Sequence, residues 1–416
     1  MYRPKPPKRL RPSLAVLALC LALPPFATAA ELDFATALAT AYQGNPELAA
    51  ASQGPGIAAG ERRQAALLPN PELSWEMEDT RSATRTTSVS LAQPLELGGK
   101  RGARVTYAER GQALAELTLE QRRNALRADT LLAFQAALRA QARSELADAS
   151  LALAERGLTV AQARIRAGKA APMEALRAQV QQDELTLERD RARTEQRQAY
   201  QRLATLMGEP RPGFERVAGR LGPLPSPPAE ARLLARLGDT ADLRLALADV
   251  AREEAGLDLE KARRYPDVTV SIGSQYSAED RQRVNLVGVS LPLPLFDRNQ
   301  GNVLSASRRA DQARDLRNAT ELRLRGDVAM ALEQWRRAQA AIDAHDRSIL
   351  PAAQQAVDSA TRGFRMGKLA FLDVLDAQRT LIDARNRYLQ AMAEATEAWA
   401  SLERLYGDLS GLDGPA

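Results

Sequence analysis

Apolar and polar residues alternate one by one in four short segments of the chain. The first segment places Leu73, Trp75 and Met77 on one face of an extended strand. The opposite face carries the acidic residues Glu72, Glu76 and Glu78. A period of two predicts a strand, and a second alternating segment follows a short polar stretch. We therefore predict one β-hairpin over residues 72–94 and, from the same pattern further along, another over residues 267–295.

The faces of these four strands favour a membrane-spanning barrel over an ordinary half-buried hairpin on a soluble domain. We expect one set of apolar residues to face lipid: Leu73, Trp75, Met77, Val89, Leu91, Val268, Val270, Ile272, Val287 and Val289. Alternating segments of about ten residues are typical of such barrels. Four strands cannot close a barrel, and open edges are very costly in lipid. The strand count therefore predicts that several copies share one barrel.

After each hairpin the pattern changes to that of a long helix. Residues 102–167 contain no proline, and residues 302–366 contain only Pro351. A helix of about 65 residues is about 100 Å long. Each long helix leads to an Arg-x-Gly-Lys segment, whose glycine is typical of the end of a helix. A second helix begins after this segment. We predict two long antiparallel helical hairpins over residues 102–207 and 302–406, with these tip residues: Arg166, Gly168, Lys169, Arg365, Gly367 and Lys368.

The two halves are repeats of each other. Gly168 and Gly367 belong to matching stretches separated by 199 positions, and the strands are offset by similar amounts. The first repeat spans residues 30–208 and the second spans residues 229–407, each with a short helix, a hairpin and a helical hairpin. A connector rich in proline and glycine covers residues 209–228, and a mobile tail is expected over residues 408–416.

Residues 1–29 read as a secretory signal peptide, with a basic start, a short apolar run and a small-residue cleavage site. Acylation at Cys20 is the alternative, but Leu19 before it is larger than such a site favours. Cys20 is the only cysteine, so the mature chain has no thiol chemistry. The leader carries five of the 57 basic residues, which leaves 52 basic and 52 acidic ones. This balance argues against a nucleic-acid partner.

No catalytic, cofactor-binding or resident metal site is predicted. The single histidine, His345, lies on a long helix, where it is more often packed or solvated than a metal ligand. The composition is 45% hydrophobic but only 4% aromatic, which suits closely packed helices. We do not expect an enzyme.

The strand pairs, the helical hairpins and the duplication together resemble TolC-type outer-membrane efflux proteins. The strand-to-helix junctions at residues 90–101 and 291–301 are similar to those of the cobalt–zinc–cadmium resistance branch. The resemblance implies a mainly α fold, in which a homotrimer joins four strands per chain into a 12-stranded outer-membrane barrel. The helical hairpins would continue as a trimeric α-barrel tunnel across the periplasm. A periplasmic adaptor and an inner-membrane RND-type, proton-driven transporter would be its partners.

The resemblance implies a passive exit duct, most consistent with heavy-metal cations as cargo. Drugs or a secreted polypeptide are the alternative cargo, and a periplasmic adaptor or coiled-coil scaffold is the alternative of another class. Family similarity also places Asp373 and Asp376 at the periplasmic aperture, as a gate. The competing interpretation is that both are acids at a helix start, where the helix dipole favours them. Carboxylates on the strands would line the pore and attract cations.

Overall fold

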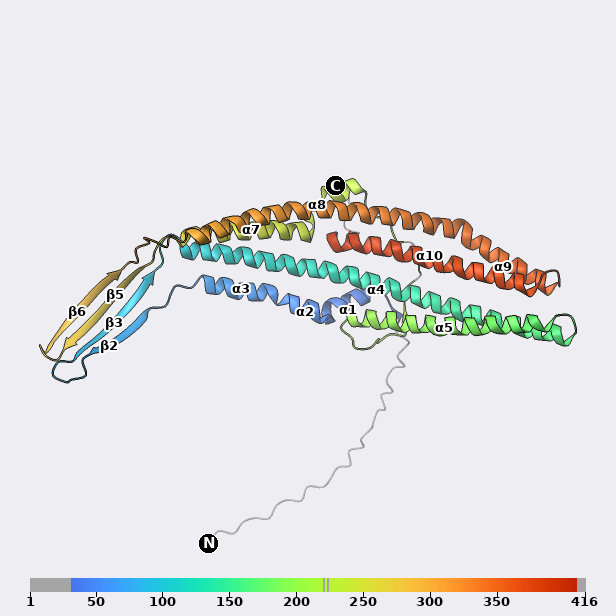
Figure 1. Cartoon of the computed structure of the whole chain (residues 1–416), viewed down its shortest axis with the longest axis horizontal. Helices are drawn as coiled ribbons and strands as arrows, with labels where there is room; N and C mark the ends of the chain where they lie inside the picture. The colour runs from blue at the N-terminus through green and yellow to red at the C-terminus, as the bar shows by residue number, and fades with distance from the viewer. Residues whose placement is uncertain (1–30, 220, 223, 410–416) are drawn as a thin grey trace, which may run out of the picture.

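The computed structural model describes residues 31–219, 221–222 and 224–409. The predicted signal peptide with Cys20, and most of the predicted tail, lie outside the described residues. An elongated layer of helices forms most of the molecule, and a single four-stranded sheet extends from one end of it (Figure 1). The turns of the two helical hairpins lie at the opposite end (Figure 1).

In the first repeat, three short helices lead into two strands and a long helical hairpin. The helices before the strands are α1 (Phe34–Gly44), α2 (Pro46–Ser52) and α3 (Gly54–Ala65). The remaining elements are β2 (Glu72–Glu78), β3 (Thr86–Leu95), α4 (Lys100–Arg166) and α5 (Pro172–Leu206). Before α1, strand β1 (Glu31–Leu32) pairs in parallel with β4 (Arg216–Val217) of the connector. The connector therefore returns along the start of the first repeat.

The second repeat follows the same order with one interruption. Its elements are α6 (Glu230–Ala235), η1 (Leu237–Asp239), α7 (Ala241–Ala262), β5 (Val268–Ser277), β6 (Gln282–Ser290), α8 (Gln300–Ala344), η2 (His345–Ile349), α9 (Leu350–Arg365) and α10 (Phe371–Tyr406). The π-helical segment η2 separates α8 from α9, whereas α4 is continuous. Pro351 explains the difference, because proline has no N–H and disrupts the regular i→i−4 ladder. Leu350 N instead donates to the His345 carbonyl, five residues back.

The four long strands form one antiparallel sheet in the order β2-β3-β5-β6. The central row of one face pairs Leu73 with Leu91, Leu91 with Ile272, and Ile272 with Val287. Strand β6 ends at Ser290, so the predicted hairpin 267–295 was too long by five residues at its end. Pro292 and Pro294 have no N–H to donate to a ladder, which explains the early end.

The elongated layer of helices, which we call the helical wall, is built from different helices at its two ends. Near the sheet, α4 packs between α3 and α7, and α7 packs on α8. Toward the tips, α4 packs on α5 and α10, and α10 packs on α8 and α9. Buried alanines such as Ala133, Ala137, Ala147 and Ala154 follow one another along α4 at spacings of 4, 10 and 7 residues, which keeps them on one side of the helix. Such small residues let long helices approach closely, as in coiled coils.

In the part of the chain that the structure describes, no helix is long and apolar enough to cross a membrane.

Candidate functional site

One face of the sheet is mainly apolar and exposed. Every residue expected to face lipid lies on this face in the observed register, because the rows of paired residues alternate between the two sides. Leu73 is 71% exposed, Val289 is 71% exposed and Val287 is 80% exposed. Ser274 and Asn285 also belong to this face, in the row of Trp75. An apolar face of this size in a single copy marks a surface that lipid or a partner covers.

The opposite face of the sheet is mainly polar, with Val284 and Leu286 of β6 as its apolar members. The strand carboxylates, by which we mean those of Glu72, Glu76 and Glu78, lie on the edge strand β2 and are exposed. Their paired neighbours on β3 are Ala92, Ser88 and Thr86. Between them, the Ser74 and Ser90 hydroxyls lie 2.7 Å apart. The structure therefore places all three acids on one side, next to small and hydroxyl-bearing residues.

Both Arg-x-Gly-Lys tips are helix ends with a left-handed glycine. Gly168 has φ of +68° and Gly367 has φ of +72°. After each glycine the lysine N–H donates back across the turn, over 2.9 Å, to the carbonyl of Arg164 or Gly363. This is the hydrogen-bond pattern of a Schellman end. The other predicted tip residues, Arg166, Lys169, Arg365 and Lys368, are all exposed.

An apolar cluster joins the two tips. The Phe364 and Phe371 rings lie 5.3 Å apart, and the Arg164 guanidinium lies 4.8 Å from the centre of the Phe364 ring. Leu158 of α4 and Ala178 of α5 belong to the same cluster. Residues of both repeats are therefore packed together at the end of the wall, and the tips form one surface.

The two predicted gate aspartates differ in their surroundings. The Asp373 carboxylate accepts a hydrogen bond from Ala370 N at 2.8 Å and thereby caps the start of α10. Asp376 is exposed and lines a groove of about 270 Å³ between α5 and α10. Arg177, the matching residue of the first repeat, lines the same groove, and Arg379 is bound to Glu184 across it at 3.4 Å. Asp373 is therefore bound to the start of its own helix, whereas Asp376 faces the groove.

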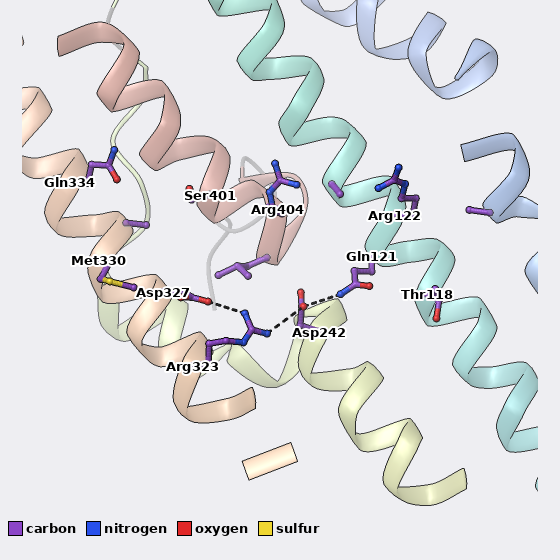
Figure 2. Close-up of a pocket in the computed structure, with 14 residues that line it drawn as sticks. Thr118, Gln121, Arg122, Asp242, Arg323, Asp327, Met330, Gln334, Ser401 and Arg404 are labelled. Atoms are coloured by element: carbon purple, nitrogen blue, oxygen red, sulfur yellow. Dashed lines mark hydrogen bonds and ion pairs between the residues drawn. The ribbon is translucent and has the colours of Figure 1, made fainter. Parts of the chain in front are cut away.

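A pocket lies in the middle of the wall, where α10 ends and α7 begins between α4 and α8. Its volume is about 720 Å³. Figure 2 shows Arg323 pointing between Asp327, at 3.1 Å, and Asp242, at 3.7 Å. Gln121 donates a further hydrogen bond to Asp242 at 2.9 Å. Both carboxylates are thus paired with one arginine, which is typical of a structural joint between helices.

Next to this joint, a buried ion pair connects the two repeats. The Arg127 guanidinium on α4 lies 3.2 Å from the Glu403 carboxylate on α10, and the Trp399 indole donates to the same carboxylate. Burial raises the pKa of Glu403, while Arg127 opposes that shift. Sequence reasoning missed this pair because 276 positions separate its members.

The structure places His345 in the π-helical segment, with Nδ1 2.8 Å from the Ala341 carbonyl oxygen. Among the described residues, no three His, Cys, Asp or Glu side chains come together as a metal site. The remaining candidate surfaces are therefore the two faces of the sheet, the tips and the grooves along the wall.

Comparison with known proteins defines the class. The sequence profile described as "Outer membrane efflux protein" matches residues 35–209 and again residues 236–408. The chain belongs to this family of efflux channels, which is not an enzyme family, and it is located in the outer membrane. The TolC-type resemblance is confirmed, and the alternative of a periplasmic adaptor or scaffold is wrong.

Individual members of the family show which efflux proteins this chain is similar to. The chain is 39% identical to the cobalt-zinc-cadmium resistance protein CzcC of Cupriavidus metallidurans, over 92% of each chain. It is 29% identical to the nickel and cobalt resistance protein CnrC of the same organism, over 68% of each chain. Its fold matches the solved outer-membrane channel OprN with a TM-score of 0.73, at 20% identity and over 90% of each chain.

Proposed function

We propose that three copies of this chain form the outer-membrane exit duct of a tripartite efflux system. The observation that carries the proposal is the sheet, which has one exposed apolar face and two unpaired edges at the end of a long helical wall. Edge strands β2 and β6 have free backbone groups that lipid cannot satisfy. Pairing β6 of one copy with β2 of the next, three times, closes a barrel with an even number of strands.

The proposed cargo is heavy-metal cations. The support is the 39% identity to a protein named for cobalt, zinc and cadmium resistance, together with the strand carboxylates. In a closed barrel with the apolar face toward lipid, the opposite face lines the pore. Three copies would then place nine carboxylates along it, and rings of acidic side chains favour cations.

The far end of the wall is the proposed gate and docking end. Asp376 from three copies would converge near the axis, beside the groove that Arg177 and Arg379 also line. The exposed basic tips, around Gly168 and Gly367, are the part of the chain farthest from the sheet (Figure 1). We assign them to contact with a periplasmic adaptor, through which an inner-membrane, proton-driven transporter would deliver cargo.

The test is complementation in a host that retains a metal-efflux adaptor and transporter but lacks their outer-membrane component. We expect this chain to lower cellular cobalt, zinc and cadmium, measured by mass spectrometry, and to purify as a trimer by native mass spectrometry. The same chain expressed without the transporter is the control and should leave metal content unchanged. If it lowers the accumulation of a dye through a multidrug transporter but never that of metal, the cargo assignment is wrong.

A further inference from the structure

The junction between the sheet and the helices carries an apolar and basic surface that the proposed duct does not explain. Beyond the end of β6, residues 291–298 are all exposed. Leu293 and Leu295 are each 70% exposed, and Phe296 is 90% exposed. Nearby, Tyr265 is 59% exposed. We call Leu293, Leu295, Phe296, Tyr265, Arg264 and Arg298 the junction belt.

The apolar members continue the lipid-facing side of the sheet. Val287 and Val289 lie on that side of β6, and the alternation continues with Leu291, Leu293 and Leu295. At Pro294 the backbone turns, and Leu295 N donates to the Leu293 carbonyl over 2.8 Å. Leu293, Leu295 and Phe296 remain exposed around this turn, which directly follows the lipid-facing strand.

The backbone is shaped to hold Tyr265 in this surface. Gly98 has φ of +70°, and a Cβ atom there would lie 2.5 Å from the Tyr265 ring. A side chain at position 98 would force the ring to move. Tyr265 and Phe296 line one groove together with Arg264 and Arg298, and aromatic residues are typical of the boundary between hydrocarbon and headgroups in barrels.

Two of the basic side chains are available to an anion. Grooves of about 640 and 610 Å³ open at the junction, and Arg264, Tyr265 and Arg298 line both. Across the two grooves there are five basic and three acidic residues. Lys100 is bound to Asp267 at 2.7 Å, and Lys261 is bound to Asp258 at 2.9 Å. Neither Arg264 nor Arg298 has a side-chain ion pair within the described part of the chain.

We propose that the junction belt binds an anionic phospholipid of the leaflet that faces the helical wall. The phosphate would lie between Arg264 and Arg298, and an acyl chain would lie along Leu293, Leu295 and Phe296. Two features favour a lipid over a free anion: the positive charge is next to exposed apolar side chains, and that surface continues the lipid-facing side of the sheet. The proposal rests on the sheet being in the outer membrane, as the proposed duct requires.

The first test uses the purified full-length mature trimer in detergent, titrated with phosphatidylglycerol and followed by native mass spectrometry. The double variant Arg264→Gln/Arg298→Gln should bind phosphatidylglycerol about 25-fold more weakly than the wild type. Each basic side chain near an anionic headgroup contributes about five-fold to binding, and the variant lacks two. The matched control is Arg281→Gln/Arg283→Gln, which removes two exposed arginines at the other end of the same sheet and should bind as the wild type does. Equal binding by both double variants overturns the proposal.

A second measurement keeps the idea testable if the double variant does not assemble. In the Phe296→Trp variant, brominated phosphatidylglycerol should quench more tryptophan fluorescence than in the wild-type trimer. Unchanged quenching would show that position 296 is buried against the next copy. Full displacement of the lipid by inorganic phosphate would show a simple anion site. Either result overturns the proposal. Conductance in bilayers of neutral lipid alone tests the duct separately, because it does not require the anionic lipid.

Discussion

An arginine in place of Ile272 tests whether the apolar face of the sheet lies in lipid. Ile272 is 57% exposed and lies in the central row of the sheet, between Leu91 and Val287. The strands of that sheet have seven to ten residues, so this row lies near the middle of their length. At the bilayer midplane an arginine costs about 2–4 kcal/mol. A trimer carries three copies, so the total is about 6–12 kcal/mol per assembly.

The control lies one residue away on the same strand. Ser271 points to the opposite face, and its paired neighbours are the small residues Ala92 and Gly288. Ser271→Arg should therefore place its charge in the aqueous pore, where the lipid penalty does not apply. The two variants have the same charge and the same strand, and they differ only in the face that carries the arginine.

The assay is folding of urea-denatured protein into vesicles, with the trimer fraction resolved on a gel without boiling. We expect Ile272→Arg to shift the urea midpoint of assembly strongly downward and to give little trimer in the outer membrane of cells. Ser271→Arg should remain close to wild type. If Ile272→Arg assembles as well as Ser271→Arg, the apolar face is not in contact with lipid and the barrel proposal fails.

Three further predictions concern the pore, the gate and the wall. Replacing all three strand carboxylates with glutamine should lower the cation selectivity of single channels in planar bilayers, and unchanged selectivity would exclude a role for them. Asp376→Ala should raise conductance and weaken block by divalent cations, whereas Asp373→Ala should instead lower stability by about 1 kcal/mol, the usual effect of losing a cap. Burial raises the pKa of Glu403, so its stabilising contribution is present at low pH and is lost as the pH rises through that raised pKa. In urea unfolding at a series of pH values, the free energy of unfolding of Glu403→Gln should rise relative to that of the wild type as the pH increases. The same pH dependence in both proteins would contradict this.

Much of the architecture could be predicted from the sequence because its signals are local and repeated. The period-two segments identified all four strands of the sheet, and the faces assigned to Trp75 and Ile272 agree with the observed register. The long stretches with at most one proline, and the glycines at positions 168 and 367, predicted the helical hairpins. Each of these features depends on residues close together in the chain, so no knowledge of distant contacts was needed.

The remaining features depended on contacts between distant residues. The order β2-β3-β5-β6 brings Leu91 next to Ile272, which decides which hairpin strands are central and which are edges. The Arg127–Glu403 pair and the pocket where α10 meets α7 exist only once the two repeats pack together. Asp373 and Asp376 looked equivalent in sequence. The tertiary structure separated them, because the position where α10 begins makes the first a cap and leaves the second facing a groove.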